Sequence, residues 1–360
     1  MRFSVYSELQ HHPGKPAAQL YAEVLEQIVH ADRLGYDVYA LIEHYFFPKF
    51  SISSNPTAVF AAAAQRTRDI RFRTMLHCLP LHNPIVLASA IAATDILTGG
   101  RYEWGVGRGH GWMPEQAGLD LDEHARPRYE EAVDLLFEAL ATKEFSHQGE
   151  YFEIGSSRVV PFPERKFRIF LGGTSDRTYT LAAEHGWGVA VPPLLPYVAL
   201  RKQLDLYRAA CDAAGTEPDI VWIHACQLDE DRETAMREAR DWVTGFIKGN
   251  CSPLTDYPLP AADRLNAAGY GFYTSGLMEG LLKIPFEQLV ADDFVWVGTP
   301  DDICERIEAT LQVCEGIKEI AITCNAGGAP HWLAIKNQQL FAERVIPQFA
   351  AADPVRAATA

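Results

Sequence analysis

An arginine between two glycines, Arg108, is the first residue of this chain whose surroundings suggest chemistry. It follows a short strand-like run, Tyr102–Val106, and the segment before that run also contains two glycines, Gly99 and Gly100. Glycine lets a ligand approach the backbone closely, and the guanidinium group offers a planar set of donors that fits a phosphate. Glycine-containing turns and surface arginines are common, so this segment indicates a phosphate site only if other segments agree with it.

A second glycine-containing segment follows a later strand-like run, Arg168–Leu171, and leads into a predicted helix. Two glycines and three hydroxyl side chains lie in it: Gly172, Gly173, Thr174, Ser175 and Thr178. Exposed amides at a helix N-terminus attract anions, and the hydroxyl groups add further donors. The same pattern also suits an ordinary capped helix that needs a tight turn. Together with the arginine at the end of the preceding strand, it predicts that two strand ends close around one phosphate.

An acidic residue and a histidine, Glu43 and His44, follow another strand-like run, Val38–Ile42. Histidine exchanges protons near neutral pH, so its place at a strand end favours a general base, and a buried core histidine is the alternative. No His-x-His or His-Glu-x-x-His motif occurs, and no carboxylates cluster at the strand ends, so no metal centre is expected. A Gly-x-Ser-x-Gly nucleophile motif is also absent from the sequence.

These residues need a scaffold that brings strand ends together, and the periodicity of the chain predicts one. Strand-like runs and helical stretches alternate eight times, which is typical of an α/β fold, a parallel (β/α)8 TIM barrel. The predicted strands are Arg2–Tyr6, Val38–Ile42, Ile70–Leu79, Tyr102–Val106, Arg168–Leu171, Gly188–Val191, Ile220–Leu228 and Ile317–Thr323. The predicted helices are Ala17–Leu34, Pro56–Arg68, Pro84–Leu97, Pro127–Thr142, Ser175–Glu184, Pro196–Ala214, Arg232–Ile247 and His331–Phe349. In such a barrel the carboxyl ends of the strands carry the chemistry, so five segments should face one cavity. They are Glu43–Tyr45, His77–Pro80, Gly107–Gly109, Gly172–Ser175 and the long segment 249–298.

Two segments interrupt this alternation within a single predicted domain, residues 1–349. Residues 144–165 are predicted to form a hairpin-like insertion that turns at Gly149. Residues 249–298 form a long excursion between the seventh and eighth strand–helix units, rich in glycine, proline and tyrosine. Long connections in a compact domain are usually functional or mobile, so the excursion is a candidate lid. Residues 350–360 are predicted to form a flexible tail.

The excursion is expected to be ordered, because it contains short helical pieces at Pro260–Ala268 and Ser275–Leu282. Apolar and aromatic side chains recur along it: Tyr257, Tyr270, Phe272, Tyr273, Leu277 and Met278. These side chains either face an apolar substrate or pack the lid onto the barrel, and the sequence favours neither alternative.

The composition is that of an ordinary globular protein of 360 residues, with 48% hydrophobic and 22% charged residues. The net charge is −15 and lysines and arginines do not cluster, so neither nucleic acid nor an anionic membrane is an expected partner. The longest apolar run, Ala58–Ala64, is too short to span a membrane, and the polar N-terminus does not resemble a signal peptide. Seven cysteines without a Cys-x-x-Cys pair suit reduced thiols, so a cytoplasmic location is predicted.

Several segments, taken in order, resemble the bacterial luciferase-like flavin monooxygenase family. The similar segments are Leu41–Phe46, Leu79–Pro84, Leu97–Gly109, the hairpin residues Gly149–Phe152, and Leu171–Gly186. The third is the most specific of them, and the resemblance extends over nearly the whole chain. The family has a (β/α)8 barrel, in agreement with the strands and helices predicted from periodicity.

The resemblance implies a flavin site. Arg108 would hold the flavin phosphate with help from the hydroxyl groups of the later glycine-containing segment. Met75 and Leu76 match a strand bulge under the isoalloxazine ring that is often built around a cis peptide bond. Glu43 and His44 match an acid–histidine pair beside the flavin, with His44 as the base. The residues expected to bind the cofactor are Met75, Leu76, Gly107, Arg108, Gly172, Gly173, Thr174, Ser175 and Thr178.

Two positions depart from the luciferases of this family. Tyr45 stands where the luciferase catalytic subunit has a second histidine, and Gly107 replaces its reactive cysteine. Light emission is therefore not expected. The small Gly107 suggests room above the flavin for a substrate bulkier than a linear aldehyde.

The implied reaction is that of a two-component monooxygenase. Reduced FMN (FMNH2) would come from a separate NAD(P)H:flavin reductase, because the sequence shows no second nucleotide-binding fingerprint. With O2 it would form a flavin C4a-(hydro)peroxide, which transfers oxygen to a small apolar organic substrate by hydroxylation or Baeyer–Villiger insertion. A closed, dry site would protect this species from decay to peroxide.

Two alternatives remain open. The family also contains deazaflavin-dependent hydride-transfer oxidoreductases, which use no oxygen, and a non-catalytic flavin-binding barrel would retain flavin without turnover. The family commonly pairs its barrels through helices near the second and third units, so a homodimer is expected.

Overall fold

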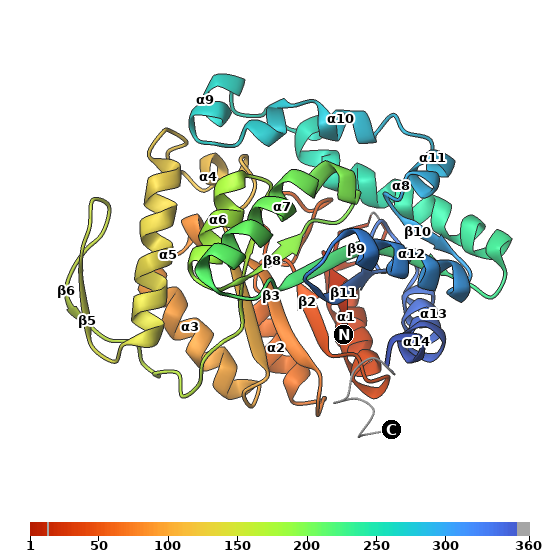
Figure 1. Ribbon diagram of the computed structural model, residues 1–360, viewed down its shortest axis with the longest axis horizontal. Coiled ribbons are helices and arrows are strands. Elements are labelled where there is room, and N and C mark those ends of the chain that lie inside the picture. Colours follow the sequence, from red (N-terminus) through yellow and green to blue (C-terminus); the bar gives the residue numbers. More distant parts are fainter. Residues whose placement is uncertain (13, 351–360) are drawn as a thin grey trace.

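Eight parallel strands close into a barrel at the centre of the computed structural model, which describes residues 1–12 and 14–350 (Figure 1). In the order in which they pair, the barrel strands are β1 (Arg2–Ser7), β2 (Val38–Leu41), β3 (Arg71–Cys78), β4 (Tyr102–Gly107), β7 (Ile169–Gly172), β8 (Gly188–Val191), β9 (Ile220–Leu228) and β11 (Ile317–Thr323). Pairing of β11 with β1 closes the ring. A further short strand, β10 (Trp296–Gly298), extends the sheet beside β9. The predicted (β/α)8 barrel is confirmed.

Helices surround the barrel (Figure 1). The longer ones are α1 (Ala17–Arg33), α2 (Pro56–Ala64), α3 (Pro84–Leu97), α5 (Ala125–Ala141), α6 (Asp176–Glu184), α7 (Tyr197–Ala214), α8 (Arg232–Asp256), α12 (Pro300–Val313) and α13 (His331–Leu340), which continues through η3 (Phe341–Val345) into α14 (Ile346–Ala350). Local signals explain where several begin. At the start of α3 the side-chain oxygen of Asn83 accepts hydrogen bonds from the backbone N–H groups of Ile85 and Val86, and Pro84 is the first helical residue.

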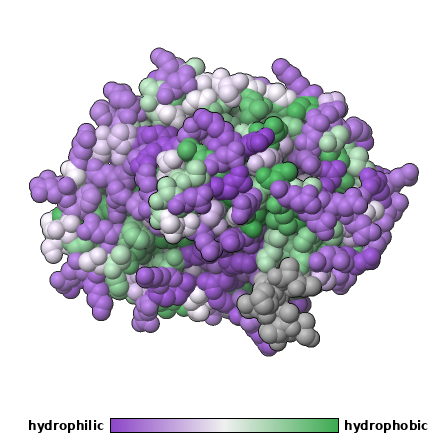
Figure 2. Space-filling view, viewed as in Figure 1, coloured by the Kyte–Doolittle hydropathy of each residue, from purple (hydrophilic) through white to green (hydrophobic). Residues whose placement is uncertain are grey.

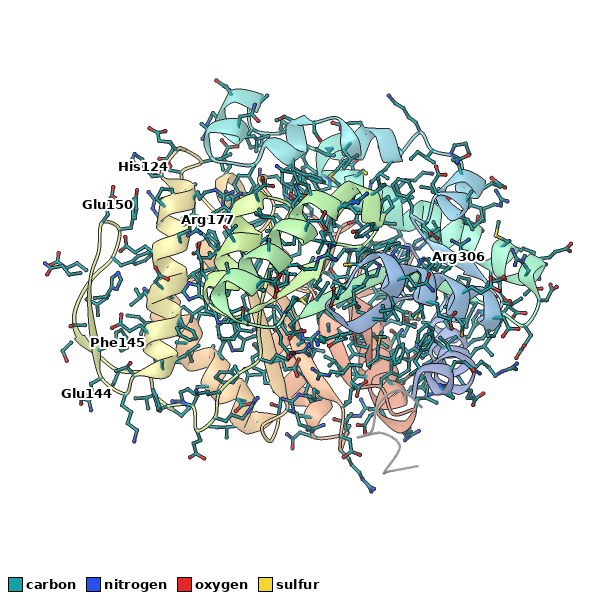
Figure 3. The ribbon with its side chains drawn as sticks, viewed as in Figure 1. His124, Glu144, Phe145, Glu150, Arg177 and Arg306 are labelled. Carbon is teal, nitrogen blue, oxygen red and sulfur yellow. The ribbon has the colours of Figure 1, made fainter. Side chains whose placement is uncertain are left out.

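Shorter elements lie in the connections between strands and helices. They are η1 (Leu79–Leu81), α4 (Met113–Gln116), β5 (Phe145–Gln148), β6 (Glu153–Ser157), α9 (Ala262–Ala267), η2 (Gly271–Thr274), α10 (Leu277–Leu281) and α11 (Phe286–Ala291). β5 and β6 pair antiparallel within residues 144–165, where the sequence predicts a hairpin-like insertion. This hairpin lies outside α5 at one edge of the molecule, with Glu144, Phe145 and Glu150 on or beside it (Figure 3).

Helix α8 is longer than predicted. It continues through residues 248–256, where the excursion was expected to begin, although Pro253 lies inside it. A Cβ atom at Gly249 would lie 2.6 Å from Nε2 of Gln10 and 2.7 Å from the backbone oxygen of Lys49, so the helix packs closely at this point. These tertiary contacts outweigh the low helix propensity of glycine and proline. We call the remaining residues, 257–295, the capping segment; Figure 1 shows α9, α10 and α11 running along one end of the barrel, at the top of the view.

Helix α12 is absent from the sequence predictions. Its start carries a recognisable signal, because Thr299 Oγ1 accepts from the backbone N–H of Asp302 at 3.3 Å and the Asp302 carboxylate accepts from the backbone N–H of Thr299 at 2.8 Å. This is a capping box, followed by a proline at the first helical position, Pro300. The sequence pattern misses this helix because the long irregular segment before it has no periodicity that marks where regular structure resumes.

Alternate strand residues point into the barrel and out toward the helices. In β1, Phe3 and Val5 belong to the apolar layer beneath the helices, whereas Tyr6 belongs to a cluster inside the barrel with Met75 and Phe170. The interior of the barrel is thus a packed core rather than a pore, as is usual for this fold.

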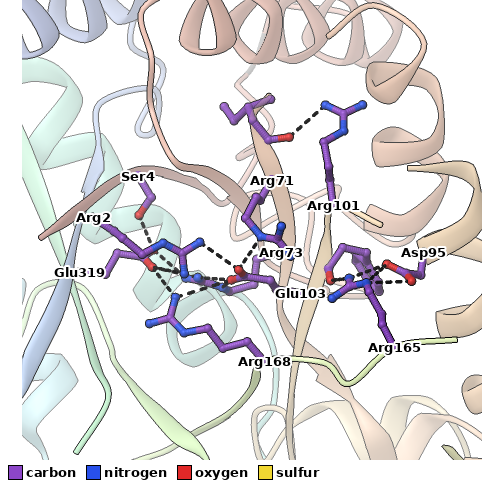
Figure 4. Close-up of polar contacts among 12 residues, drawn as sticks. Arg2, Ser4, Arg71, Arg73, Asp95, Arg101, Glu103, Arg165, Arg168 and Glu319 are labelled. Atoms are coloured by element: carbon purple, nitrogen blue, oxygen red, sulfur yellow. Dashed lines mark hydrogen bonds and ion pairs between the residues drawn. The ribbon is translucent and has the colours of Figure 1, made fainter. Parts of the chain in front are cut away.

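An ion network closes the amino end of the barrel (Figure 4). Arg73, Glu103 and Glu319 are buried there, and Nη1 of Arg73 donates to Oε1 of Glu319 at 2.7 Å while its Nη2 pairs with Glu103. Nη1 of Arg168 donates to Oε2 of Glu319 at 3.1 Å, and Nη2 of Arg2 donates to Oε1 of Glu103 at 2.9 Å. Buried charges persist when they are paired and hydrogen-bonded in this way. This end of the barrel is therefore structural.

The visible face of the molecule is mostly polar, with smaller apolar areas among the polar residues (Figure 2). Three exposed apolar side chains, Val86, Ile96 and Leu97, belong to α3. Among the described residues, no helix combines the length and the hydropathy that crossing a membrane requires. Residues 351–360 of the predicted flexible tail lie outside the described part of the chain.

Candidate active site

A cavity of about 450 Å³ lies at the carboxyl ends of the barrel strands, under the capping segment. Its walls come from β1, β3, β4, β7, β8, β9 and α8, and residues 269–273 with Met278 and Leu281 cover it. The cavity brings together all of the residues that the sequence predicts to bind a cofactor: Met75, Leu76, Gly107, Arg108, Gly172, Gly173, Thr174, Ser175 and Thr178. Glu43 also lines it. These residues lie close together, as predicted, and their role in binding a cofactor stays a prediction.

The hydroxyl groups predicted to bind phosphate meet at one side of the cavity, at the start of α6. Ser175 Oγ and Thr178 Oγ1 are 2.9 Å apart, and Nη2 of Arg126 from α5 donates to Ser175 Oγ at 3.2 Å. Burial and the positive charge of the nearby Arg108 lower the pKa of the Arg126 guanidinium. Two like charges held close together are stabilised when an anion lies beside them. Arg126 is therefore a further candidate ligand of a phosphate, which the sequence predictions do not include.

Arg108 itself contacts the capping segment. Its Nη1 donates to the backbone oxygen of Ala268 at 2.7 Å, and its Nη2 donates to that of Gly269 at 2.6 Å. The guanidinium group also lies over the ring of Tyr270, 4.1 Å from the ring centroid. Charge-assisted bonds of this length are strong. Arg108 thus holds the cover onto the hydroxyl-rich side of the cavity, and any anion bound there would have to share its donors or replace these carbonyl groups.

The predicted strand bulge lies in β3. The peptide bond between Met75 and Leu76 is cis, and the pairing of β3 with β4 is irregular at that point. The side chain of Leu76 fills the space beside two glycines: a Cβ atom at Gly172 would lie 2.2 Å from Leu76 Cδ1, and one at Gly107 would lie 3.0 Å from it. The expectation that Gly107 leaves free room for a bulky substrate is therefore wrong, because Leu76 occupies that space.

Glu43 accepts hydrogen bonds from two histidines. Its Oε2 accepts from Nδ1 of His77 and its Oε1 from Nε2 of His82, each at 2.6 Å. The hydroxyl of Tyr45 and the backbone N–H of Cys78 also donate to Oε1, at 3.1 and 3.2 Å. Burial raises the pKa of Glu43, but the two imidazoles outweigh burial and lower it to about 2. The carboxylate is ionised, so the ring nitrogens facing it carry hydrogens.

The hydrogen bonds continue from His77 into the barrel wall. Nε2 of His77 lies 2.8 Å from the hydroxyl oxygen of Tyr102, which in turn lies 2.7 Å from Oγ1 of Thr74. At the other end of the chain, the side chain of His82 is 26% exposed. The network therefore connects a cavity-lining imidazole, through a buried carboxylate, with a histidine that solvent can reach. Such networks fix ring orientation and give protons a route to solvent.

His44 lies outside both the network and the cavity. Its ring is fully buried and stacks on Phe50 with centroids 4.1 Å apart, and neither ring nitrogen has a partner among the described residues. Burial and the neighbouring His110 lower the pKa of His44 well below its usual value, so the ring is neutral. The predicted Glu43–His44 pair is therefore not formed. His44 has the surroundings of a core histidine, and His77 stands beside Glu43 in its place.

The predicted strand-end segment His77–Pro80 contains His77 but assigns it no role, and the same signal could have identified His82 and Glu8. Glu8 directly follows β1, His77 is the last residue but one of β3, and His82 lies in the Leu79–Pro84 segment of the family resemblance. A search for every titratable residue near a strand end would have included all three. Glu43, His77 and His82 also hold their ligand atoms within 4.8 Å of one another, a spacing that suits a metal ion.

The capping segment contacts the loop after β4 through aromatic side chains. The hydroxyl of Tyr273 lies 2.7 Å from Nδ1 of His110, and the hydroxyl of Tyr270 donates to the backbone oxygen of Arg108 at 3.1 Å. Burial lowers the pKa of His110 to about 4, so the ring is neutral at pH 7. Tyr270 and Tyr273 also line the cavity, together with Phe272. Tyr270 and Tyr273 thus pack the capping segment onto the barrel while they line the cavity, whereas Tyr257 is exposed and lies outside the cavity lining; a contact with substrate stays a prediction.

The profile of the luciferase-like monooxygenase family matches residues 1–313, and the chain belongs to this family. An uncharacterised protein of Sinorhizobium fredii is 33% identical over 46% of this chain and 48% of its own length, so the alignment spans about half of that relative. The 5,10-methylenetetrahydromethanopterin reductase of Archaeoglobus fulgidus is 25% identical over 91% of this chain and 96% of that protein. The oxygenase component of flavin-dependent trigonelline monooxygenase from Acinetobacter baylyi is 26% identical over 77% and 80%.

Solved structures share the fold. A monooxygenase from Streptomyces bottropensis matches with a TM-score of 0.79 at 26% identity, over 97% of this chain and 100% of that chain. The oxygenating constituent of 3,6-diketocamphane monooxygenase from Pseudomonas putida, solved in complex with FMN, matches with a TM-score of 0.75 at 22% identity, over 97% and 98%. Monooxygenases and a reductase are thus both among the relatives of this chain.

Proposed function

We propose that this member of the luciferase-like monooxygenase family is the oxygenase of a two-component system, which uses reduced FMN and O2 to oxygenate a small apolar organic molecule. The observation that carries the proposal is the cavity, in which a cationic, hydroxyl-rich side adjoins an apolar interior under a cover. FMN has the same division, with one phosphate and one large flat ring. The FMN in the diketocamphane monooxygenase structure and the flavin dependence of the trigonelline relative support this assignment.

The residues of the cavity fit FMN. Arg108 and the hydroxyl of Thr178 would hold its phosphate, with Arg126 adjoining them through Ser175, because charged donors and hydroxyl groups bind phosphate oxygens strongly. A Cβ atom at Gly173 would lie 3.0 Å from Oγ1 of Thr178, so a larger residue there would crowd the hydroxyl group that the phosphate needs. The bulge of β3 and its apolar neighbours would contact the ring.

Reduced FMN, when bound, supplies with O2 an activated oxygen atom for transfer to the substrate. The residues of the chain then have to exclude water and control a proton. Water is excluded by the capping segment, which is tied down through Tyr273 to His110 and through Arg108 to the backbone of Ala268 and Gly269. Closure of this kind raises the share of oxygen that reaches the substrate.

We propose His77 for the proton-transfer role that the sequence assigned to His44. His77 lines the cavity, and Glu43 accepts the hydrogen of its Nδ1. Its Nε2 lies 2.8 Å from the hydroxyl of Tyr102, so proton transfer requires this nitrogen to exchange Tyr102 for the reacting group. The ionised carboxylate fixes the orientation and tautomer of the ring, which is the usual task of an acidic partner beside a catalytic histidine. Hydrogen bonds through Glu43 also link the ring of His77 to His82, whose side chain is partly exposed.

Oxygen transfer provides the direct test. The protein is mixed with chemically reduced FMN and ¹⁸O2 in the presence of cyclic ketones, long-chain ketones or monoterpenes, and products are examined by mass spectrometry. We expect one ¹⁸O atom in at least one product and consumption of O2 that requires FMN. Release of hydrogen peroxide with every compound, and no labelled product, would contradict an oxygenase.

A deazaflavin-dependent hydride transfer is the second candidate, because the Archaeoglobus reductase is similar over 91% of this chain. The same cavity would then bind a deazaflavin, and O2 would have no part in the reaction. Titrations with FMN and with the deazaflavin F420, followed by measurement of O2 uptake, separate the two candidates. Tight flavin retention without any turnover would instead indicate a non-catalytic flavin-binding barrel.

A separate NAD(P)H:flavin reductase, a homodimer and a cytoplasmic location complete the proposal. The relatives described as an oxygenase component and as an oxygenating constituent support the reductase partner. The exposed Val86, Ile96 and Leu97 of α3 support a homodimer, because apolar residues gathered on one helix are typical of an interface.

A further inference from the structure

A buried acidic residue, Glu8, lines the cavity on the side opposite the phosphate-binding residues. It directly follows β1, which lies four places from β7 in the closed ring of barrel strands. Glu8 is 1% exposed, and its partner Asn250 of α8 lines the same cavity. A flavin held at β3, β4 and β7 leaves this side of the cavity to the substrate.

The Glu8 carboxyl is bonded only by neutral groups among the described residues. Its Oε2 accepts from Nδ2 of Asn250 at 3.0 Å and from Nε2 of Gln10 at 3.3 Å. The hydroxyl oxygen of Tyr6 lies 3.4 Å from Oε1. This distance is longer than the usual O–H···O distance of about 2.5–3.0 Å. Two amides occupy Oε2, so the hydrogen of the protonated acid lies on Oε1, where it has no good acceptor.

The charge state of Glu8 is the reverse of that of Glu43. Burial raises the pKa of Glu8 to about 8, and the hydrogen bonds from Asn250, Tyr6 and Gln10 offset burial only in part. Tyr6 of β1 is the titratable group that faces it, and burial raises the pKa of Tyr6 as well, so both groups are neutral at pH 7. The cavity therefore contains a hydrogen-bond acceptor, the ionised carboxylate of Glu43, and a hydrogen-bond donor, the protonated carboxyl group of Glu8.

We infer that Glu8 is a substrate-recognition residue, whose Oε1–H donates a hydrogen bond to a carbonyl oxygen of the substrate. The inference rests on the proposed function, because it assigns the β1 side of the cavity to the substrate. Ile247, Met278 and Leu281 make the cavity apolar at α8 and α10. A neutral carbonyl compound satisfies the acid hydrogen without bringing a charge into apolar surroundings. Ketones should therefore bind in preference to hydrocarbons of the same shape.

Two probes of nearly equal shape test this inference: cyclohexanone, and methylenecyclohexane, in which a CH2 group replaces the oxygen. Dissociation constants are measured by ligand-observed NMR on wild-type protein with and without FMN, and on Glu8→Gln, Glu8→Leu and the surface control Glu144→Gln. One hydrogen bond predicts about 2- to 12-fold tighter binding of the ketone. Glu8→Gln keeps a donor and most of this preference, Glu8→Leu loses it, and Glu144→Gln leaves it unchanged.

The pH dependence gives a second measurement on unmodified protein. The acid hydrogen is present below the raised pKa of Glu8 of about 8, so the preference for the ketone should fade as the pH rises through 8. The carboxylic acid C=O band in the infrared spectrum should disappear over the same range, and it should be absent from Glu8→Gln. Equal binding of the two probes by wild-type protein would overturn the inference, as would tighter binding of cyclohexylammonium than of cyclohexanone.

FMN binding and oxygen transfer, measured on the wild-type protein, test the proposed function independently of the role of Glu8. If FMN does not bind to wild-type protein, the oxygenase proposal is wrong whatever the probes do. If FMN binds and oxygen is transferred, but ketone preference is equal in Glu8→Leu and wild-type protein, only the role of Glu8 is wrong.

Discussion

Arg108 has two competing partners in this protein: the backbone oxygens of Ala268 and Gly269, and the phosphate of the proposed FMN. Arg108→Ala should weaken FMN binding by about one to two decades, because one charge-assisted hydrogen bond contributes roughly 1.5–3 kcal/mol. Riboflavin lacks the phosphate, so its affinity should change little. Fluorescence quenching titrations with both flavins measure the difference.

The control for this experiment is Arg264→Ala, which removes a half-exposed arginine of α9 that pairs with Glu115 outside the cavity. It should leave both affinities within about twofold, as is usual for surface pairs. Equal weakening of FMN and riboflavin by Arg108→Ala would show that the arginine only holds the capping segment.

The two histidines near Glu43 should behave differently when replaced. His77→Asn should lower product formation by roughly 10²–10⁴, the range for loss of an acid–base group, and should leave FMN affinity within a few-fold. His44→Phe should keep activity and should not lower stability, because it removes two buried ring nitrogens without partners and keeps the contact with Phe50. Measurements of coupled turnover and of thermal unfolding on both variants test these two expectations.

The reverse result, with activity lost in His44→Phe and kept in His77→Asn, would restore His44 as the base. It would also require the ring of His44 to turn into the cavity during the reaction.

At the scale of elements, the capping segment is the part of the molecule whose mobility matters most. It connects α8 with β10, neither of which is a barrel strand. Arg108, Tyr270 and Tyr273 tie residues 268–273 to the loop after β4, and apolar residues of α10 and α11 pack against α8. Connecting segments at the surface open at lower free energy than barrel strands and are cleaved first by proteases.

Trypsin should therefore cleave the ligand-free protein first between Lys248 and Lys283, and flavin should protect this region. Within that range Lys248 lies inside α8 and Arg264 inside the short α9, so Lys283, which follows α10, is the expected first site. Tyr273→Phe removes the hydroxyl that bonds His110 and should speed cleavage and increase peroxide release. Mass spectrometry of the first fragments and a peroxide assay measure both effects.

Cleavage that begins in the β5–β6 hairpin, with no effect of flavin at Arg264 or Lys283, would identify the capping segment as a fixed structural insertion. A Tyr273→Phe variant with unchanged coupling would lead to the same conclusion.

At the scale of the whole molecule, the ion network at the amino end of the barrel joins strands that are far apart in the sequence. Glu319→Gln leaves Arg73 with a buried charge that is only partly compensated, so it should lower the free energy of unfolding by about 3–5 kcal/mol. Glu144→Gln, on the exposed hairpin, should change it by less than about 0.5 kcal/mol. Urea denaturation at pH 7 measures both variants.

The pH dependence of stability follows from the same carboxylate. Burial raises the pKa of Glu319, but Arg73 and Arg168 outweigh burial and lower it from 4.5 to about 2 in the folded protein. Its stabilising effect is complete above about pH 4.5 and is lost as the pH falls toward 2. The difference in stability between wild-type protein and Glu319→Gln should therefore narrow over this range. A constant difference from pH 5 to pH 2 would contradict the proposed charge state of Glu319.

Much of this architecture can be predicted from the sequence, because alternating periodicity acts locally. All eight barrel strands and the starts of α2 and α3 follow from residue patterns within a few positions, such as asparagine before proline. The strand-end rule also placed Arg108 and the segment Gly172–Ser175 at one cavity, since parallel strands in a closed barrel end on the same side.

The tertiary structure decided which side chains face the cavity and in which charge state. Glu43 and His44 are adjacent in sequence, and only the packing of Phe50 against His44 shows that the histidine is buried away from the cavity. Glu8 and Asn250 are 242 positions apart, so neither their hydrogen bond nor the raised pKa of Glu8 has a local signal. Local periodicity fixes where a residue stands on an element, whereas burial and partners depend on which distant segments pack around it.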